Sequence, residues 1–345
     1  EKMNLILSDY SGITIDNINV DSNDAASIKN LIDVTKVVVT TVGPYQLYGS
    51  EIVKACALNG VDYVDLCGEP AWMHTMIKNY KEDAIKSGSR ILFSCGFDSI
   101  PFDLGVFYLQ NKIISNYGKP ANSVRGRVRV MQGEFSGGTA ASFKATMQSL
   151  KKNHDLFNVL ANPFSLSEGF QGPDQPADNK PLYDKDLNSW VTPFFMAPIN
   201  TKNIHRTNML LNHLYGKEFT YNEMWMTGDG DEGKNLAKLI VSSNPFSSEK
   251  GELKPGDGPT KESRESGSYD ILFCGNIDEK NVLNASVKGD MDPGYGSTSK
   301  MMAETAICIF KNTTLKGGIY TPAAALGLEL IDRLEKNAGL TFKYE

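Results

Sequence analysis

The side chains best suited to chemistry follow short, uncharged, strand-like segments. The first segment, Val37–Val42, contains only β-branched residues and leads into the turn Gly43-Pro44-Tyr45. A run of this kind is typical of a strand buried on both faces in a parallel sheet. Ligands of such sheets bind beyond the carboxyl ends of the strands. Residues 41–49 are therefore predicted to form a binding rim, where glycine permits close approach and tyrosine offers a ring for stacking.

Two further strand-like segments end in carboxylates beside glycines. Asp62–Leu66 runs into Cys67-Gly68-Glu69-Pro70, and Arg90–Cys95 runs into Gly96-Phe97-Asp98-Ser99. Asp65 and Glu69 could orient a ligand, or Asp65 could cap the helix that follows Pro70. Asp98 precedes a helix whose N-terminal dipole favours anions, and Ser99 could cap that helix.

Helical patterns alternate with these strands and must position their ends. Lys2–Leu7 resembles the end of a helix, and Ile15–Val20 is predicted to be a short strand that ends at Asp21. Further helices are expected at residues 25–31, 50–59, 72–87 and 100–110. Repeated βα units with short turns predict an α/β fold with a doubly wound parallel sheet.

The middle of the chain has a different pattern. Residues 125–131 alternate arginine with apolar residues, which predicts a strand with one wet face. Gly137-Gly138-Thr139 precedes a helical pattern to Phe157 and could contact a substrate carbonyl or phosphate, or simply form a turn. Residues 162–181 and 251–267 read as polar loops. Antiparallel strands are expected at 268–275 and 282–289, and helices at 298–310 and 322–337.

Composition narrows the class of protein. A length of 345 residues suggests two domains, and a net charge of −6 argues against non-specific nucleic-acid binding. No apolar run is long enough for an integral membrane segment, and no signal peptide is recognisable. Five scattered cysteines without a CxxC pair indicate buried free thiols in a reducing cytoplasm, and four scattered histidines give no metal-site spacing.

Several short motifs, taken together, resemble one family. They are Gly43-Pro44-Tyr45 with Tyr48-Gly49, Tyr63-Val64-Asp65 with Gly68-Glu69-Pro70, Gly96-Phe97-Asp98-Ser99-Ile100-Pro101 with Asp103-Leu104-Gly105, Pro255-Gly256 with Gly258-Pro259, Gly289-Asp290, Pro293-Gly294-Tyr295-Gly296, and Gly317-Gly318 with Thr321-Pro322-Ala323. The chain resembles the saccharopine dehydrogenase-like oxidoreductases over nearly its whole length. It is most similar to their bacterial trans-acting enoyl reductase branch.

The resemblance implies a Rossmann domain interrupted by a mixed α/β domain. Residues 1–118 would form the dinucleotide-binding domain, 119–297 the domain for substrate or dimerisation, and 298–345 helices that return to the first domain. It further implies NADP(H) as cofactor and reduction of a carbon–carbon double bond in an acyl or polyketide chain, free or carrier-bound. A homodimer is compatible with this organisation.

Residues at the predicted strand ends are the candidates for contact with NADP(H). They are Asp21, Thr41, Val42, Gly43, Pro44, Tyr45, Gly68, Gly96, Phe97 and Asp98. Each also has a plainer explanation as a turn, a cap or a solvated loop residue.

Reduction of an enoyl group requires a proton donor for the α carbon. The candidates are Tyr45, Tyr48 and Tyr295, although most tyrosines are packing residues with a wet tip. Surface or core roles are expected for His154, His205 and His213. The apolar cluster of Trp190 with residues 194–196 could line an acyl groove or belong to the core.

Two rival functions remain open. Arg125, Arg127, Arg129 and Arg206 could bind the carboxylates of an amino-acid imine in a saccharopine-type reductase, although a solvated edge strand explains the first three equally well. Alternatively, the fold could serve non-catalytic binding.

One motif of the family is absent from the chain. No first strand with a GxxGxxG turn is present, nor the Gly-Arg that ends the second strand. That glycine turn brings the backbone close to the pyrophosphate. We therefore expect the natural protein to have roughly 40 to 50 further residues before Glu1, the size of the missing βαβ portion.

Overall fold

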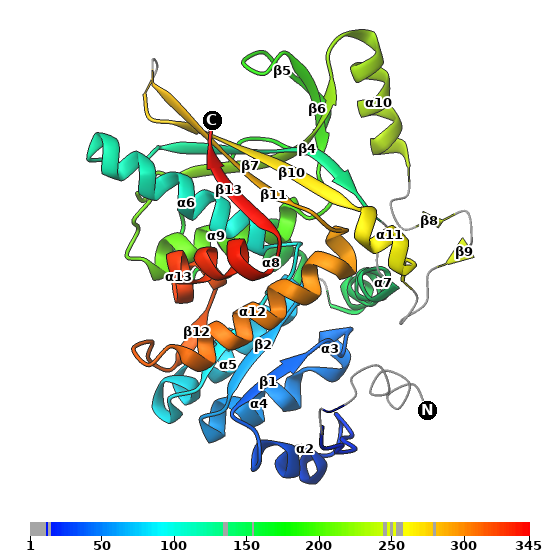
Figure 1. Ribbon diagram of the computed structural model, residues 1–345, viewed down its shortest axis with the longest axis vertical. Helices are drawn as coiled ribbons and strands as arrows, with labels where there is room; N and C mark the ends of the chain where they lie inside the picture. The colour runs from blue at the N-terminus through cyan, green and yellow to red at the C-terminus, as the bar shows by residue number, and fades with distance from the viewer. Residues whose placement is uncertain are drawn as a thin grey trace.

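The protein is represented by a computed structural model with two β-sheets and helices between and around them. It describes residues 12, 15–133, 137–153, 155–243, 247–248, 251–252, 258–278 and 281–345. In Figure 1 the first sheet lies at the bottom and the second at the top. The predicted α/β class, with a parallel sheet and a second mixed domain, is confirmed.

The first sheet is parallel. Its strands, in spatial order, are β1 (Val37–Thr40), β2 (Asp62–Asp65), β3 (Arg90–Leu92) and β12 (Gly318–Tyr320). All four residues of β2 are buried, so both faces of that strand are covered. β12 pairs with β3 although the two strands are far apart in the sequence. Beside them, the side chain of Arg90 donates a hydrogen bond to the carbonyl of Asn312, 222 residues further along the chain.

The helices expected at residues 25–31, 50–59, 72–87 and 100–110 are present, and a further short helix lies within the predicted turn, at Tyr45–Tyr48. They are α2 (Ala25–Ile32), α3 (Tyr45–Tyr48), α4 (Ser50–Asn59), α5 (Pro70–Ser87) and α6 (Ile100–Tyr117). Gly88 and Gly118 end α5 and α6 in the left-handed conformation, which glycine adopts without a steric penalty.

Two expectations about the first sheet are wrong. Residues 15–20 form no strand, and the side chains of Ile15 and Ile18 are exposed, because no described strand lies beside them. Val39 and Val42 are about half exposed, at 47% and 49%, so β1 is not buried on both faces. The β-branched pattern predicts an extended segment. Whether that segment is buried depends on other parts of the chain that pack against it. The segment Lys2–Leu7 lies outside the described residues.

The second sheet has seven strands in the order β13-β11-β10-β4-β7-β6-β5. Their bounds are β4 (Ser123–Gln132), β5 (Leu182–Asp184), β6 (Ser189–Pro193), β7 (Thr220–Gly228), β10 (Ser268–Asn276), β11 (Val282–Gly289) and β13 (Leu340–Tyr344). Neighbours run antiparallel except β4 and β7, which are parallel. The antiparallel pair predicted for 268–275 and 282–289 is confirmed.

The remaining elements surround this sheet. They are α7 (Gly137–Lys152), α8 (Asp155–Ala161), α9 (Ala197–Leu210), α10 (Gly230–Ser242), the two-residue strands β8 (Ser247–Ser248) and β9 (Gly251–Glu252), α11 (Lys261–Ser266), the π-helical turn η1 (Pro293–Ser297), α12 (Thr298–Lys311) and α13 (Pro322–Asn337). Most of residues 162–181 lack regular structure, as expected.

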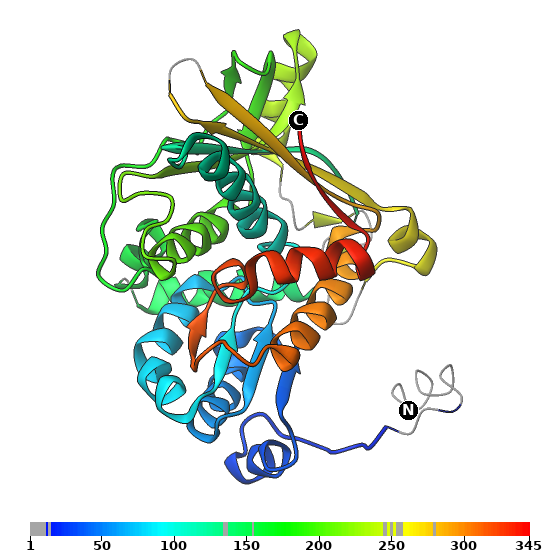
Figure 2. The same ribbon diagram turned by 60° about the vertical axis from the view of Figure 1, so that its left-hand side comes forward.

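Three helices tie the two sheets together. α12 and α13 lie between the sheets in both views (Figures 1 and 2). Helix α6 packs against β10 so closely that a Cβ on Gly105 would lie 2.3 Å from the ring of Phe273. The buried carboxyl of Asp103 accepts hydrogen bonds from Thr207 of α9 and the backbone N–H of Ala323 of α13. The boundaries proposed between domains stay a prediction.

Two chemical expectations can be compared with the structure. All five cysteines are buried and free, as predicted. Among the described residues, no helix is both long and apolar enough to cross a membrane.

Candidate functional site

A cleft lies where the carboxyl ends of the parallel strands face the second domain. The space in it that a water-sized molecule can enter is about 50 Å³, and the cleft is partly open to solvent. Some lining residues follow β2 and β3, and the others belong to β4 and the residue after it, α7, the segment before α9, η1 and the first residue of α12. The lining residues are Leu66, Gly96, Phe97, Asp98, Met131, Gly133, Thr139, Phe195, Pro293, Gly294 and Thr298. This is the position at which open α/β sheets bind ligands.

Tyr45, in the rim after β1, is buried and hydrogen-bonded to the ends of two strands. The hydroxyl of Tyr45 donates to the carbonyl of Thr40 at 3.0 Å and receives the backbone N–H of Leu66 at 3.4 Å. Its ring lies 5.6 Å from that of Trp72. Burial and the nearby carboxyl of Asp65 raise the pKa of Tyr45 far above its ordinary value. Tyr45 therefore connects the ends of two strands.

The buried carboxylate of Glu69 fixes the start of α3. It accepts the backbone N–H groups of Tyr45 (2.8 Å) and Gln46 (3.0 Å). It also accepts the side-chain amide of Gln46 (2.8 Å) and the hydroxyl of Ser142 in α7 (2.7 Å). Because all four donors bind one carboxylate, Glu69 connects the rim after β1 to helix α7.

Helix α7 makes further contacts with the same rim. The side chain of Gln46 donates to the hydroxyl of Thr146 (3.1 Å) and accepts from the hydroxyl of Ser149 (2.7 Å). The N-terminal end of α7 faces the cleft through Thr139. The helix therefore reaches from the second domain over the strand ends of the first.

Asp65 organises the turn after β2. Its carboxyl accepts the hydroxyl of Tyr63 (2.9 Å) and the backbone N–H groups of Cys67 (2.9 Å) and Ser94 (3.0 Å). Burial raises its pKa to about 7, while these hydrogen bonds oppose the rise. The alternative that Asp65 caps α5 is wrong, because Glu69 precedes that helix and its side chain caps a different one.

Asp98 differs from the other carboxyl groups of the site. Among the described residues its carboxyl has no hydrogen-bond donor and no cationic partner, yet it lines the cleft. Burial raises its pKa to about 6. The neighbouring Ser99 does not cap α6 as expected; it instead donates to Asn200 and accepts from Asn203, both in α9. A raised pKa in a cleft is typical of functional groups.

The other predicted residues are distributed more widely. Gly96 and Phe97 line the cleft, and the backbone N–H of Phe97 donates to the hydroxyl of Thr298 at 2.9 Å. Asp21 is exposed in the turn before α2, where its carboxyl accepts the N–H of Asn23. Tyr48 is exposed at the end of α3, and Tyr295 lies in η1 with its ring against Gly258. The structure does not bring the three tyrosines together.

The remaining rim candidates surround the cis peptide between Gly43 and Pro44. Thr41 and Val42 are exposed, and Gly68 lies beside the Met196 side chain. A Cβ on Gly43 would meet nothing closer than 3.6 Å, and one on Gly68 nothing closer than 3.4 Å. At both positions a Cβ would therefore make only ordinary van der Waals contacts with the protein.

The arginines of β4 are engaged within the chain. Arg125 and Arg127 both contact Asp184, and Arg127 is buried. Arg129 pairs with Asp270 and Glu345. The solvated edge-strand explanation is wrong, because β4 lies between β10 and β7 in the middle of the sheet. Arg206 is also buried, and its guanidinium contacts Glu168 and the carbonyls of Leu166 and Ile319.

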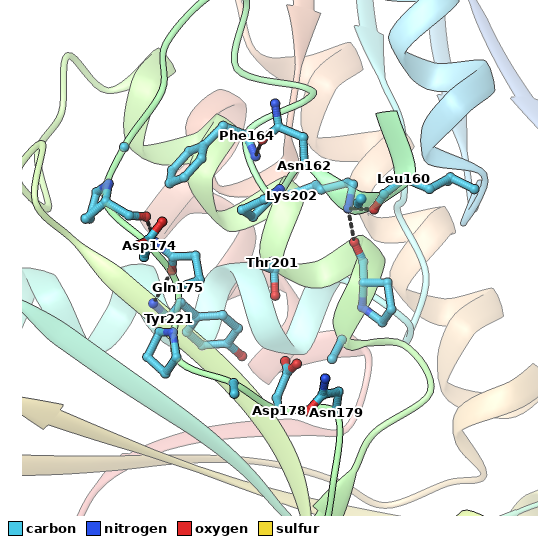
Figure 3. A pocket seen from close by; sticks show the side chains of 18 of the residues that line it. Leu160, Asn162, Phe164, Asp174, Gln175, Asp178, Asn179, Thr201, Lys202 and Tyr221 are labelled. Carbon is cyan, nitrogen blue, oxygen red and sulfur yellow. Dashed lines mark hydrogen bonds between the residues drawn. The ribbon is translucent and has the colours of Figure 1, made fainter. Parts of the chain in front are cut away.

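A larger hollow lies between α9, the end of α8 and residues 171–179 (Figure 3). It encloses about 1080 Å³ of space that includes open solvent. Buried Lys202 donates to the carbonyls of Leu160 (2.8 Å) and Pro198 (3.1 Å), and desolvation lowers its pKa to about 8. Since no residue of the first sheet lines this hollow, it is separate from the strand-end cleft.

None of the histidines that the structure describes lines the strand-end cleft. His205 is buried beside Gln175, and desolvation lowers its pKa to about 3, so it is neutral. His213 packs near Phe170, and burial lowers its pKa too. His154 lies outside the described residues. Of the apolar cluster, Phe194 and Met196 are buried, Trp190 is partly exposed, and Phe195 lines the cleft.

Several cleft residues could not be identified from the sequence. Met131, Gly133 and Thr298 carry no local signal, because they reach the cleft from strands and helices distant in sequence. The structure explains why residue 133 is a glycine. A Cβ there would lie 2.6 Å from Pro293, so the contact between the two lining segments requires a glycine.

The cleft suits the nicotinamide end of a dinucleotide. Leu66 and Phe97 provide apolar walls for a planar ring, whereas Gly43 and Gly68 are not among the described lining residues. The GxxGxxG pattern that would hold the pyrophosphate is absent from the sequence.

Comparisons with known proteins identify the family. Residues 1–92 match the saccharopine dehydrogenase NADP binding domain. The chain is 33% identical to a Mycobacterium tuberculosis protein assigned by name to the trans-acting enoyl reductases, over 92% of this chain and 82% of that protein. It is 30% identical to a trans-acting enoyl reductase of Mycobacterium ulcerans, over 91% of this chain and 81% of the relative.

A solved structure supports the fold. Saccharopine dehydrogenase (L-Glu forming) of Saccharomyces cerevisiae superposes with a TM-score of 0.53 at 10% identity, covering 99% of this chain and 91% of that one. The chain is thus an NADP-dependent oxidoreductase of the saccharopine dehydrogenase-like family and belongs to its trans-acting enoyl reductase branch.

Proposed function

We propose that the protein reduces the carbon–carbon double bond of an enoyl thioester, with the substrate bound in the strand-end cleft. The observation that carries this proposal is the make-up of the cleft. Apart from the carboxyl of Asp98, its described lining has no ionisable side chain, and its walls include Leu66, Met131 and Phe195. Such a site suits an uncharged acyl chain better than a substrate with several charges.

Each side of the cleft has a distinct role in the proposed reaction. Bound NADPH supplies the hydride for the β carbon. The rim at Thr41–Tyr45, together with Gly68, Gly96 and Phe97, holds the nicotinamide end. The N-terminal end of α7, which reaches the cleft at Thr139, stabilises the negative charge that develops on the thioester oxygen. Phe195 contacts the acyl chain.

Reduction of an amino-acid imine is the weaker alternative. That chemistry requires cations that are free to bind two carboxylates. Arg125, Arg127 and Arg129 instead bind carboxylates of the chain itself. The pairing therefore favours an acyl substrate over an amino-acid substrate.

The test begins with fluorescence titration of NADPH into the full-length protein and its Gly43→Ala and Gly68→Ala variants. Because a Cβ fits at both positions without a close contact, these variants should fold normally. We expect the dissociation constant for NADPH to rise about tenfold, a loss near 1.4 kcal/mol. Leu58→Ala, at an exposed position of α4 outside the rim, is the control and should bind NADPH as the wild type does.

Turnover then separates the reaction classes. NADPH oxidation is measured with crotonyl-CoA, and separately with lysine plus 2-oxoglutarate, which together form an imine. Oxidation with the thioester alone supports the proposal. Oxidation with the amino acid and oxo acid alone would refute it, as would oxidation with neither substrate by protein that binds NADPH tightly.

A further inference from the structure

The unpartnered carboxyl group of Asp98 is unusual among the carboxyl groups at the strand ends. Asp65 accepts three hydrogen bonds and Glu69 accepts four, so both have structural partners that explain their burial. Asp98 has no such partner among the described residues, although it follows β3 at the same edge. Asp98 is partly exposed, so its carboxyl can be reached by a ligand in the cleft and is not committed to another described side chain.

The surroundings of Asp98 favour the protonated form of its carboxyl. Burial is the cause of the raised pKa, which is about 6, and no charged neighbour contributes. The elements that face it present Leu66, Met131, Gly133, Thr139, Phe195, Pro293, Gly294 and Thr298. None of these is ionisable. A carboxyl in an apolar cleft with a pKa near neutrality is suited to general acid catalysis.

The three tyrosines are less well placed for this role. Tyr45 donates its hydroxyl proton to the carbonyl of Thr40 and would have to break that bond first. Tyr48 and Tyr295 do not line the cleft. Among the described residues that line the cleft, Asp98 is therefore the ionisable side chain that can contact a bound substrate.

We propose that Asp98 is the general acid that protonates the α carbon when the enoyl thioester is reduced. The inference rests on the proposed function. Hydride adds to the β carbon, and the π electrons of the double bond move toward the α carbon and the thioester oxygen. The α carbon then takes the proton of the Asp98 carboxyl, and the carboxylate regains a proton from water. One hydride and one proton are consumed for each double bond.

The first measurement concerns the carboxyl group itself and needs no turnover. Carboxyl ¹³C resonances of aspartate-labelled protein are titrated by NMR, and the Asp98 signal is identified by its loss in Asp98→Asn. A midpoint near pH 6 supports the proposal. A midpoint near 4, the value of an ordinary aspartate, would overturn it, because almost no acid form would remain at neutral pH.

The second measurement follows the product. A 2-methyl-branched enoyl thioester (tigloyl-CoA) gives a product with a stereocentre at the α carbon. Wild-type protein should form one configuration, because Asp98 delivers the proton from one side. Asp98→Asn should lower kcat by 10²- to 10³-fold and give a mixture, because water protonates either side. NADPH binding should be unchanged.

Two variants complete the design. Asp98→Glu keeps an acid in the cleft and should restore much of kcat, whereas Asp174→Asn, an exposed carboxyl in the larger hollow, should leave kcat unchanged. Full kcat and a single configuration in Asp98→Asn would overturn the role of Asp98 and leave the proposed function intact. Weakened NADPH binding with unchanged product configuration would also overturn it and assign Asp98 to the cofactor. A wild-type protein that binds NADPH but reduces no enoyl thioester would refute both proposals.

Discussion

The most informative perturbation is the removal of the Glu69 carboxylate, because one group holds the rim and α7 together. In Glu69→Ala, the backbone N–H groups of Tyr45 and Gln46 lose their acceptor in a buried position. A hydrogen bond to a charged group contributes about 1.5 to 3 kcal/mol, so losing two should cost about 3 to 6 kcal/mol. Domains are typically stable by about 5 to 15 kcal/mol, so this is a large fraction.

Glu69→Gln removes the charge of the side chain and keeps its size, so it measures the effect of the charge alone. A glutamine has the same size, but its NH₂ group must replace one oxygen and so face at least one backbone N–H donor. We expect a loss of about 1 to 3 kcal/mol, smaller than for alanine. The exposed residue Glu51, which pairs with Lys54, is the matched control, and Glu51→Gln should not shift the unfolding midpoint.

Equilibrium unfolding in urea provides the assay. Tryptophan fluorescence and far-UV circular dichroism should give coincident transitions before a free energy is derived. If Glu69→Gln and Glu69→Ala both unfold within 0.5 kcal/mol of the wild type, an approximate margin for surface substitutions, the reasoning fails. In that case the four hydrogen bonds to Glu69 do not stabilise the rim.

Two further predictions concern Lys202 and Gly105. Because burial lowers the pKa of Lys202 to about 8, the unfolded chain binds one more proton between about pH 8 and 10.5, so stability should rise with pH in that window by about 3 kcal/mol. Lys202→Met should lack this rise in urea unfolding at pH 7.5 and 10; equal pH dependence in both proteins would contradict the desolvation argument. Gly105→Ala should destabilise by about 1 to 3 kcal/mol, because its Cβ would overlap Phe273, and Phe273→Leu should restore part of the loss. A more stable Gly105→Ala, as helix propensity alone predicts, would show that α6 and β10 can separate.

The sequence predicts most of the local structure because local signals define it. The bounds of α4 are those expected, since Gly60 ends the helix after a run of helix-compatible residues. Burial is less predictable, because it depends on distant neighbours. Alternation in β4 suggests a wet face, but Arg127 is buried by Asp184, which lies 57 residues further along the chain.

The same distinction applies to the cleft. Gly96, Phe97 and Asp98 could be identified because they follow a strand, and strand ends are binding sites in this class of fold. Thr298 could not, because it is 201 residues from Phe97, to which it is hydrogen-bonded. That Asp98 has no partner among the residues that the structure describes is likewise a property of the assembled cleft and has no counterpart in the sequence.

The pairing of β12 with β3 has a consequence for synthesis on the ribosome. β3 is complete at Leu92, but its partner ends at Tyr320, close to the end of the chain. At roughly 5 to 20 residues per second, the ribosome needs on the order of 10 to 45 seconds to make the intervening segment. Throughout that interval one edge of β3 has no β12 to pair with, and such edges attract other strands. A nascent chain of this protein would therefore depend on chaperone protection until its last helices emerge.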